Sequence, residues 1–130
     1  MTIDTSALIA ILFDEPERLE FTQLVSVASR KLISTVSILE ATIVLECRKG
    51  EDGVADLDAW LRKAAVRSVD FDSDQLELAR RASHRFGKGR HPAALNFGDC
   101  ASYAHSQWSG EPLLFKGNDF TLTDVLRVRS

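Results

Sequence analysis

The chain has few of the residues that build disulfide frameworks, zinc sites or membrane spans. Its two cysteines, Cys47 and Cys100, stand apart without CxxC spacing, so neither a disulfide framework nor a zinc site is expected. The longest unbroken apolar run, residues 7–13, is too short to cross a membrane, and Asp4 rather than a basic region precedes it. Nothing in this pattern directs export, and we therefore expect a reducing, cytoplasmic setting.

The size and composition are those of one folded domain. With 130 residues, of which 45% are hydrophobic, the chain is large enough to bury a core. It contains no internal repeat, low-complexity tract or linker. We therefore expect a single domain spanning residues 1–130.

Short apolar strands alternate with helical segments along the whole chain. Strands are expected at 2–3, 32–33, 66–71, 112–115 and 125–128, and helices from about 7 and at 16–29, 36–49, 51–64, 73–87 and 96–110. Pro16 suits the first position of the second helix, and Gly50 is a fitting stop for the third. This alternation predicts an α/β fold with a parallel sheet of four to five short strands, covered by helices on both faces.

Two helical stripes predict which residues face the core. The stripe of the second helix comprises Leu19, Leu24, Val27 and Ala28. The stripe of the third comprises Val36, Leu39, Ile43 and Cys47, which recur at helical spacing. Both cysteines, which stand alone without CxxC spacing, are expected to be small core residues.

Four carboxylates stand where a parallel sheet would gather them. Asp4 and Asp119 follow strands, Asp99 stands at a helix start, and Glu40 lies beside the apolar stripe early in a helix. Ligands of open α/β sheets bind at the carboxyl ends of the strands. Helix capping is the alternative for Asp4 and for Asp99, which follows Asn96 by three residues, whereas Glu40 is costly in apolar surroundings unless it is paired.

These four acids would make a metal site built only from oxygen ligands. Carboxylates without cysteine or paired histidines suit Mg²⁺ or Mn²⁺ rather than zinc. A cation held there could orient a phosphodiester and turn bound water into a nucleophile. The spacing of the acids alone does not name a substrate.

Positive charge is concentrated in one segment. Residues 79–98 contain five basic residues, two histidines and no acid, so the segment carries +5 and the other 110 residues carry −8. Arg81 and Arg85 lie four apart on one helical face, and Lys88 and Arg90 continue into the loop towards Asp99. We expect these four side chains to contact phosphates beside the acids; a solvated helix face is the alternative.

Four sequence blocks, in order, resemble the signature blocks of PIN-domain ribonucleases. The blocks are Asp4-Thr5-Ser6-Ala7-Leu8, Ser37-Ile38-Leu39-Glu40-Ala41, Asn96-Phe97-Gly98-Asp99-Cys100 and Lys116-Gly117-Asn118-Asp119-Phe120. They are specifically similar to those of VapC-type toxins of toxin–antitoxin pairs. The resemblance implies a three-layer α/β fold, Mg²⁺-dependent endonuclease cleavage of RNA, a homodimer and a small VapB-type antitoxin.

The resemblance also implies roles for individual residues. Asp4, Glu40 and Asp99 match the first three acids of the family, and Ser6 matches a hydroxyl that supports the site. Many members place the fourth acid where this chain has Gly117, so Asp119 is the nearest carboxylate. Direct binding of metal by Asp119, binding through water and a small contribution all stay open.

Further expectations concern residues outside the acids. Metal-activated water needs no imidazole base, so His84, His91 and His105 are expected to be surface or substrate contacts. Apolar residues on the early helices, Phe13, Leu19 and Phe21, are expected to be exposed and to bind the antitoxin.

Two other functions compete with the ribonuclease hypothesis. A non-catalytic interaction module of the same fold would be favoured if any of the first three acids were replaced, and none is. A phospho-receiver domain would want two neighbouring acids after the first strand, whereas Asp4 stands alone.

Overall fold

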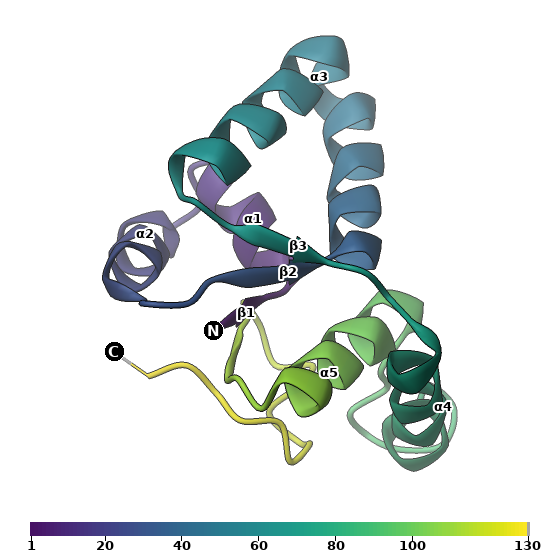
Figure 1. Ribbon diagram of the computed structural model, residues 1–130. Helices are drawn as coiled ribbons and strands as arrows, with labels where there is room; N and C mark the ends of the chain where they lie inside the picture. The colour runs from purple at the N-terminus through teal and green to yellow at the C-terminus, as the bar shows by residue number, and fades with distance from the viewer. Residues whose placement is uncertain (130) are drawn as a thin grey trace.

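A four-stranded parallel sheet lies at the centre of the molecule (Figure 1). The structure is a computed structural model that describes residues 1–129. The strands are β1 (Thr2–Ile3), β2 (Leu32–Ser34), β3 (Arg67–Val69) and β4 (Leu113–Leu114), in the order β3-β2-β1-β4. All three pairs are parallel, and Thr2 of β1 lies opposite Leu32 and Leu113. The carboxyl ends of all four strands therefore meet at one edge.

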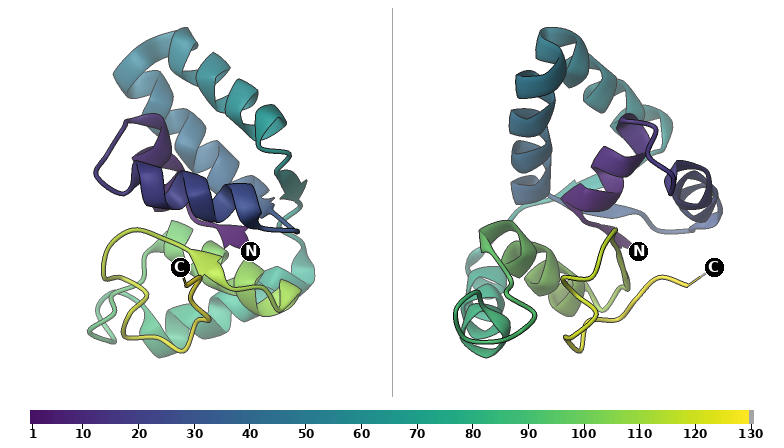
Figure 2. Two further views of the ribbon diagram at one scale, coloured as in Figure 1. Left: turned by 90° about the vertical axis from the view of Figure 1, so that its left-hand side faces the viewer. Right: turned by 180° about the vertical axis from the view of Figure 1, so that it is seen from behind.

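Helices cover both faces of this sheet, which gives three layers (Figures 1 and 2). One face carries α1 (Thr5–Leu12), α2 (Arg18–Val27) and α3 (Thr35–Lys63). The other carries α4 (Ser73–Phe86) and α5 (Phe97–Ser109), which pack against each other. The predicted α/β fold class is confirmed.

The helix α3 bends sharply and has two arms (Figure 1). At the bend Gly50 has φ 61° and ψ −145°, a conformation that is essentially open only to glycine. The two arms correspond to the helices predicted on either side of Gly50. The bend lets the second arm turn back towards the start of β3.

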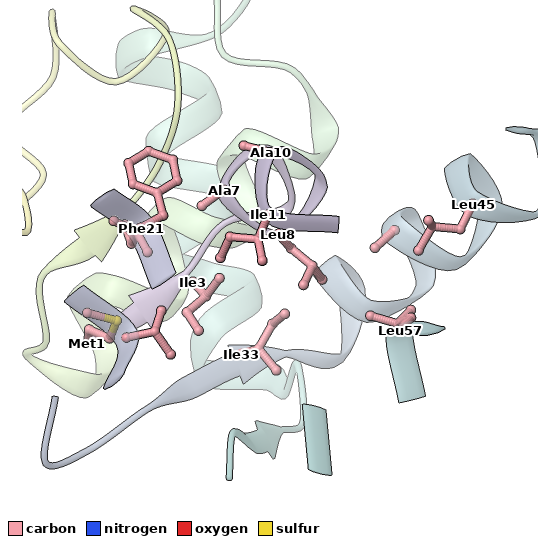
Figure 3. Close-up of a cluster of buried hydrophobic side chains, with 13 residues drawn as sticks. Met1, Ile3, Ala7, Leu8, Ala10, Ile11, Phe21, Ile33, Leu45 and Leu57 are labelled. Carbon is pink, nitrogen blue, oxygen red and sulfur yellow. The ribbon is translucent and has the colours of Figure 1, made fainter. Parts of the chain in front are cut away.

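The larger of two apolar cores lies between the sheet and α1, α2 and α3. Figure 3 shows its side chains, among which Ile3, Leu8, Ile33, Leu45 and Leu57 are fully buried. A second cluster joins α4 and α5 to β4 and includes Cys100, Tyr103 and Phe115. The sheet is therefore packed against an apolar core on each of its two faces.

The predicted core face of α3 is wrong. Leu39 and Ile43 are exposed, and so is Cys47, whereas Ser37, Ala41 and Leu45 are buried. The first arm packs against α1 and α5, and its small residues allow that approach. Cys100 is buried as expected.

Smaller corrections concern α2 and the ends of elements. Leu19 and Val27 are exposed, whereas Phe21 and Val25 are buried. The helix begins at Arg18 rather than Pro16, because the Arg18 amide donates to the Glu15 carbonyl in a turn.

The predicted strand at 125–128 is reduced to a single parallel bridge between Arg127 and Leu113. The third strand is also shorter than predicted, at Arg67–Val69. The sheet therefore has four strands, the lower of the two predicted numbers.

Candidate functional site

Asp4 lies at the carboxyl end of β1 and is held by three donors. One carboxylate oxygen, Oδ2, accepts from the Ser6 amide at 3.0 Å and from the Ser6 hydroxyl at 2.6 Å. The other, Oδ1, accepts from the Ser102 hydroxyl at 2.5 Å. Asp4 thus caps α1, as the alternative reading required, and it also presents a fixed carboxylate at the sheet edge.

Glu40 lies on the first arm of α3, and its carboxylate is seated against Gly98. A methyl group added at Gly98 would lie 2.7 Å from Glu40 Oε1, which is closer than real contacts allow. The bare backbone of α5 therefore makes room for the carboxylate. This contact joins two helices from opposite faces of the sheet.

Asp99 is fixed at the start of α5 by a reciprocal capping box. The Asn96 side chain accepts from the Asp99 amide at 2.9 Å, and Asp99 Oδ2 accepts from the Asn96 amide at 3.1 Å. This is the pattern that the three-residue spacing of Asn96 and Asp99 predicted. One carboxylate oxygen of Asp99 is left for other partners.

Asp119 is exposed on the loop that follows β4, near the other three acids. The same loop is tied to the start of α1, because the Lys116 amide donates to the Ser6 hydroxyl at 3.0 Å. Ser6 therefore joins Asp4 to the loop that carries Asp119. The Lys116 ammonium is paired with Glu15 and Glu17.

The electrostatics of Asp99 report that the four acids are close together. Burial raises the pKa of Asp99 from 3.8 to about 6, and the amide of Asn96 opposes this rise. The charges of Asp4, Asp119 and Glu40 each raise the pKa further. Asp4 and Glu40 both contact α5 beside Asp99, through Ser102 and Gly98, and the charge of Asp119 acts on Asp99; we call these four acids the carboxylate cluster.

The donor chemistry of the carboxylate cluster suits a hard divalent cation. Asp4 is nine-tenths or more buried, and the Ser6 and Ser102 hydroxyls that donate to it are neutral. They therefore do not cancel the negative charge of the four acids, which act on one another. Within residues 1–129, no three Asp, Glu, His or Cys side chains lie close enough together to coordinate one metal ion. The chemistry of these ligands, all oxygen and mutually repelling, is nevertheless the kind that Mg²⁺ and Mn²⁺ prefer.

The predicted basic residues divide between two surfaces. Lys88 lines a hollow between α4 and α5, and Arg90 lines a smaller hollow with Arg80 and His84. Arg85 instead pairs with Asp124 at 3.4 Å and lies over the Phe86 ring. Arg81 is exposed on α4.

Several expectations for other side chains are wrong. Phe21 is buried, and Phe13 is half-buried beneath Arg48 and Lys49, so Leu19 alone of the three predicted antitoxin contacts is fully exposed. His105 is fully buried rather than on the surface. Burial, followed by the charge of Arg30, lowers the pKa of His105 to about 4, so its imidazole is neutral.

Sequence reasoning missed two serines behind the acids. Ser102 donates to Asp4, and its hydroxyl lies 3.4 Å from that of Ser37. Ser102 follows Asp99 by three residues, and Ser37 precedes Glu40 by three. Helical spacing from the acids would therefore have found both.

Comparison with known proteins shows the family. The family model described as the PIN domain matches residues 1–126. The chain is 53% identical to a protein named Ribonuclease VapC from Mycolicibacterium smegmatis, over 98% of this chain and 99% of that protein. It is 51% identical to Ribonuclease VapC30 of Mycobacterium tuberculosis, over 98% of each.

Solved structures share the fold at lower identity. The crystal structure of Mycobacterium tuberculosis VapC20, described as a sarcin-ricin loop cleaving toxin, aligns with a TM-score of 0.79 and 20% identity over 99% of this chain and 98% of that one. VapBC2 from Rickettsia felis, bound to a DNA fragment from its promoter, aligns with a TM-score of 0.75 and 15% identity over 98% and 96%. The chain therefore belongs to the PIN-domain family, among the VapC ribonucleases.

Proposed function

We propose that this chain is the metal-dependent endoribonuclease toxin of a toxin–antitoxin pair, and that it hydrolyses RNA phosphodiester bonds at the carboxylate cluster. The observation that carries the proposal is that Asp4, Glu40, Asp99 and Asp119 come from four separate elements and that the charges of the other three act on Asp99, whose pKa is raised mainly by burial. The names of the relatives at 51–53% identity support an RNA substrate.

Three of the four acids have a structural support that would fix their place around a cation. A bound Mg²⁺ or Mn²⁺ would supply activated water and neutralise charge on the phosphate. Ser6 and Ser102 orient the Asp4 carboxylate, and the Asn96 amide orients Asp99. Glu40 reaches the cluster across the bare backbone of Gly98. Asp119 adds charge from the loop after β4 and is the least constrained of the four.

Replacement of Asp4 tests the catalytic assignment. Asp4→Asn should lower the rate of RNA cleavage by about 100-fold or more, because a displaced ligand misplaces the reacting groups. Asp70→Asn is the matched control, since Asp70 also follows a strand but is exposed outside the cluster. Circular dichroism should be unchanged in both variants. Full activity of Asp4→Asn would exclude this mechanism.

Thermal unfolding tests the metal independently of activity. A cation that binds only the folded protein stabilises it by about 2.7 kcal/mol at 100 times its Kd. Millimolar Mg²⁺ or Mn²⁺ should therefore raise the melting temperature, and Asp99→Asn should reduce the rise. A melting curve that neither ion moves would contradict the metal site, even if RNA were cleaved.

We also propose a VapB-type antitoxin as partner and a homodimer as the assembly. Two structural neighbours are described as VapBC2 and as a toxin–antitoxin complex from Klebsiella pneumoniae, which supports such a partner. Co-expression with the adjacent reading frame should yield a stable complex, and light scattering of the purified chain should give twice the monomer mass. No copurifying partner and no growth arrest on expression would favour the non-catalytic module instead.

A further inference from the structure

Phe97 is an aromatic side chain that is exposed to solvent. Its exposed fraction is 81%, although it is the first residue of α5 and lies two residues from Asp99. The capping box between Asn96 and Asp99 fixes the backbone on both sides of it. The ring is therefore presented at a defined place next to the carboxylate cluster.

Helical geometry directs Phe97 and Asp99 to different sides of α5. Residues three and four apart share a helical face, so Phe97 lies with Cys100 and Ala101, whereas Asp99 faces the other acids. Phe97, Cys100 and Ala101 line a hollow of about 550 Å³ between α4 and α5. We call it the α4–α5 hollow.

The floor of the α4–α5 hollow is apolar. Its other walls include Leu76 and Ala79 of α4 and Phe71, which follows β3. The Phe71 amide donates to the Thr35 hydroxyl at the start of α3, so this wall is anchored at the carboxyl edge of the sheet. The hollow therefore lies at the same edge of the sheet as the carboxylate cluster. Its lining residues on α5 are within one helical turn of Asp99, which is about 5.4 Å along the helix axis.

The rim of the α4–α5 hollow is cationic. Arg80 and Lys88 line it, and Arg80 and Ser83 also line a second hollow of about 240 Å³ with His84 and Arg90. Among the described residues that line these two hollows there is no acid. The ion pair of Arg80 with Glu77 is exposed, so it leaves the guanidinium available to an anion.

An apolar slot with a cationic rim matches one nucleotide of a single strand. The base has a π face that stacks on an aromatic ring, and its phosphate is an anion. A purely apolar peptide anchor would fill the slot but would supply no counter-charge to Lys88 at its rim.

We propose that the α4–α5 hollow is a nucleobase subsite. In it, Phe97 stacks on the base next to the phosphodiester at the carboxylate cluster, and Arg80 and Lys88 hold the adjoining phosphate. The inference rests on the proposed RNA substrate. It adds that Phe97 positions the RNA strand relative to the carboxylate cluster.

Binding of a short fluorescein-labelled oligouridylate, measured by anisotropy in EDTA, tests the stacking directly. Phe97→Ala should weaken binding by about 5- to 150-fold, the range expected for loss of one base stack. Phe97→Tyr should bind as the wild type does. Leu19→Ala is the matched control, since Leu19 is 83% exposed on α2, and it should leave the affinity unchanged. Equal affinities of Phe97→Ala and wild type would overturn the proposal.

Removal of the base provides the second arm. An abasic residue is placed in turn at each position beside a mapped cut. At one position the abasic residue should weaken binding by the wild type as much as Phe97→Ala does. At that position it should not weaken binding by the Phe97→Ala variant any further. Additive losses at every position would overturn the subsite.

Two further outcomes separate this inference from the proposed function. If the wild type cleaves no RNA, the proposed function fails, and the oligouridylate arm still decides whether the subsite exists. If Phe97→Ala weakens a protein complex or the dimer while RNA affinity is unchanged, Phe97 is a protein anchor and the subsite is overturned.

Discussion

Asp99 occupies a position that is unfavourable for its own charge. Its pKa of about 6 exceeds the ordinary value of 3.8, mainly because of burial. Between these two pH values the folded chain binds more protons at Asp99 than the unfolded chain does. The free energy of unfolding therefore falls as the pH rises through this window and stays reduced above about pH 6.

Asp99→Asn should consequently make the protein more stable while it impairs cleavage. The amide oxygen of the new side chain can still accept from the Asn96 backbone, but it carries no charge to be desolvated. The gain should be on the order of 1–2 kcal/mol above pH 6, less than two pKa units would give, because the cluster borders solvent. It should vanish towards pH 4.

Urea unfolding in EDTA at these two pH values measures the difference. Asp70→Asn, an exposed acid outside the cluster, should show no gain that depends on pH. Identical urea midpoints for Asp99→Asn and wild type above pH 6 would show that the charge of Asp99 does not destabilise the folded protein.

Gly98 has a prediction of its own, because the atoms nearest to an added methyl group all belong to Glu40. Gly98→Ala should lower cleavage and stability, since the new methyl would collide with the Glu40 carboxylate. In a Glu40→Ala background the collision is gone, and the same change should stabilise α5 by about 0.5–1 kcal/mol, the ordinary helical preference for alanine. Denaturant unfolding of the four proteins in this cycle checks the reversal of sign.

Residue patterns predicted the positions of the acids better than they predicted the supports of those acids. The capping box of Asn96 and Asp99 is local, so spacing along the chain found it. The contact of Glu40 with Gly98 joins residues far apart in the chain, and no local pattern contains it. The role of Ser102 likewise depends on how α5 crosses β1.

At the scale of elements, the bend of α3 is the feature most directly encoded in the sequence. Gly50 alone gives the chain the conformation that the bend requires, and its position predicted where one helix would stop. The stripe prediction failed on the same element because periodicity identifies apolar faces, not the face that is packed. Ser37 and Ala41 are buried because close helix packing selects small residues, while Leu39 and Ile43 point outward.

Gly50→Ala should destabilise the protein by about 1–3 kcal/mol, the cost of holding a Cβ in that backbone region. No neighbouring atom crowds the position, so the loss would come from backbone strain alone. Thermal or urea unfolding measures it. Glu51→Ala, at the adjacent exposed position, should stay within about 0.5 kcal/mol of wild type. An unchanged stability for Gly50→Ala would mean that the bend tolerates another conformation.

At the scale of the whole molecule, the parallel sheet assembles the candidate site. Alternating strands and helices predicted that the carboxyl ends of the strands would meet, and this accounts for the convergence of Asp4, Asp99 and Asp119. The order β3-β2-β1-β4 depends on which helices pack on which face, and no strand of two or three residues specifies its neighbours. The tail at 125–128 shows the same limit, because it lies beside β4 with one bridge only.

The arrangement also sorts the basic residues into two groups with different expected effects on RNA. Arg80, Lys88 and Arg90 line the hollows beside the carboxylate cluster, whereas Arg85 is paired with Asp124 on the side of α4 near Tyr103. Replacing the first three by alanine should reduce the slope of log affinity against log salt by up to about 2, at 0.7 for each phosphate contact on a single strand.

The predicted contact of Arg85 is tested in the same titration. Arg85→Ala should change the slope less than Lys88→Ala does, since Arg85 lines neither of the hollows beside the carboxylate cluster. A variant with Arg62, Lys63 and Arg67 replaced is the control of equal charge, because these exposed residues lie at the end of α3 and the start of β3, at the opposite edge of the sheet. Equal slopes for both triple variants would mean that net charge alone attracts the RNA, because a diffuse field does not depend on which edge of the sheet bears the cations.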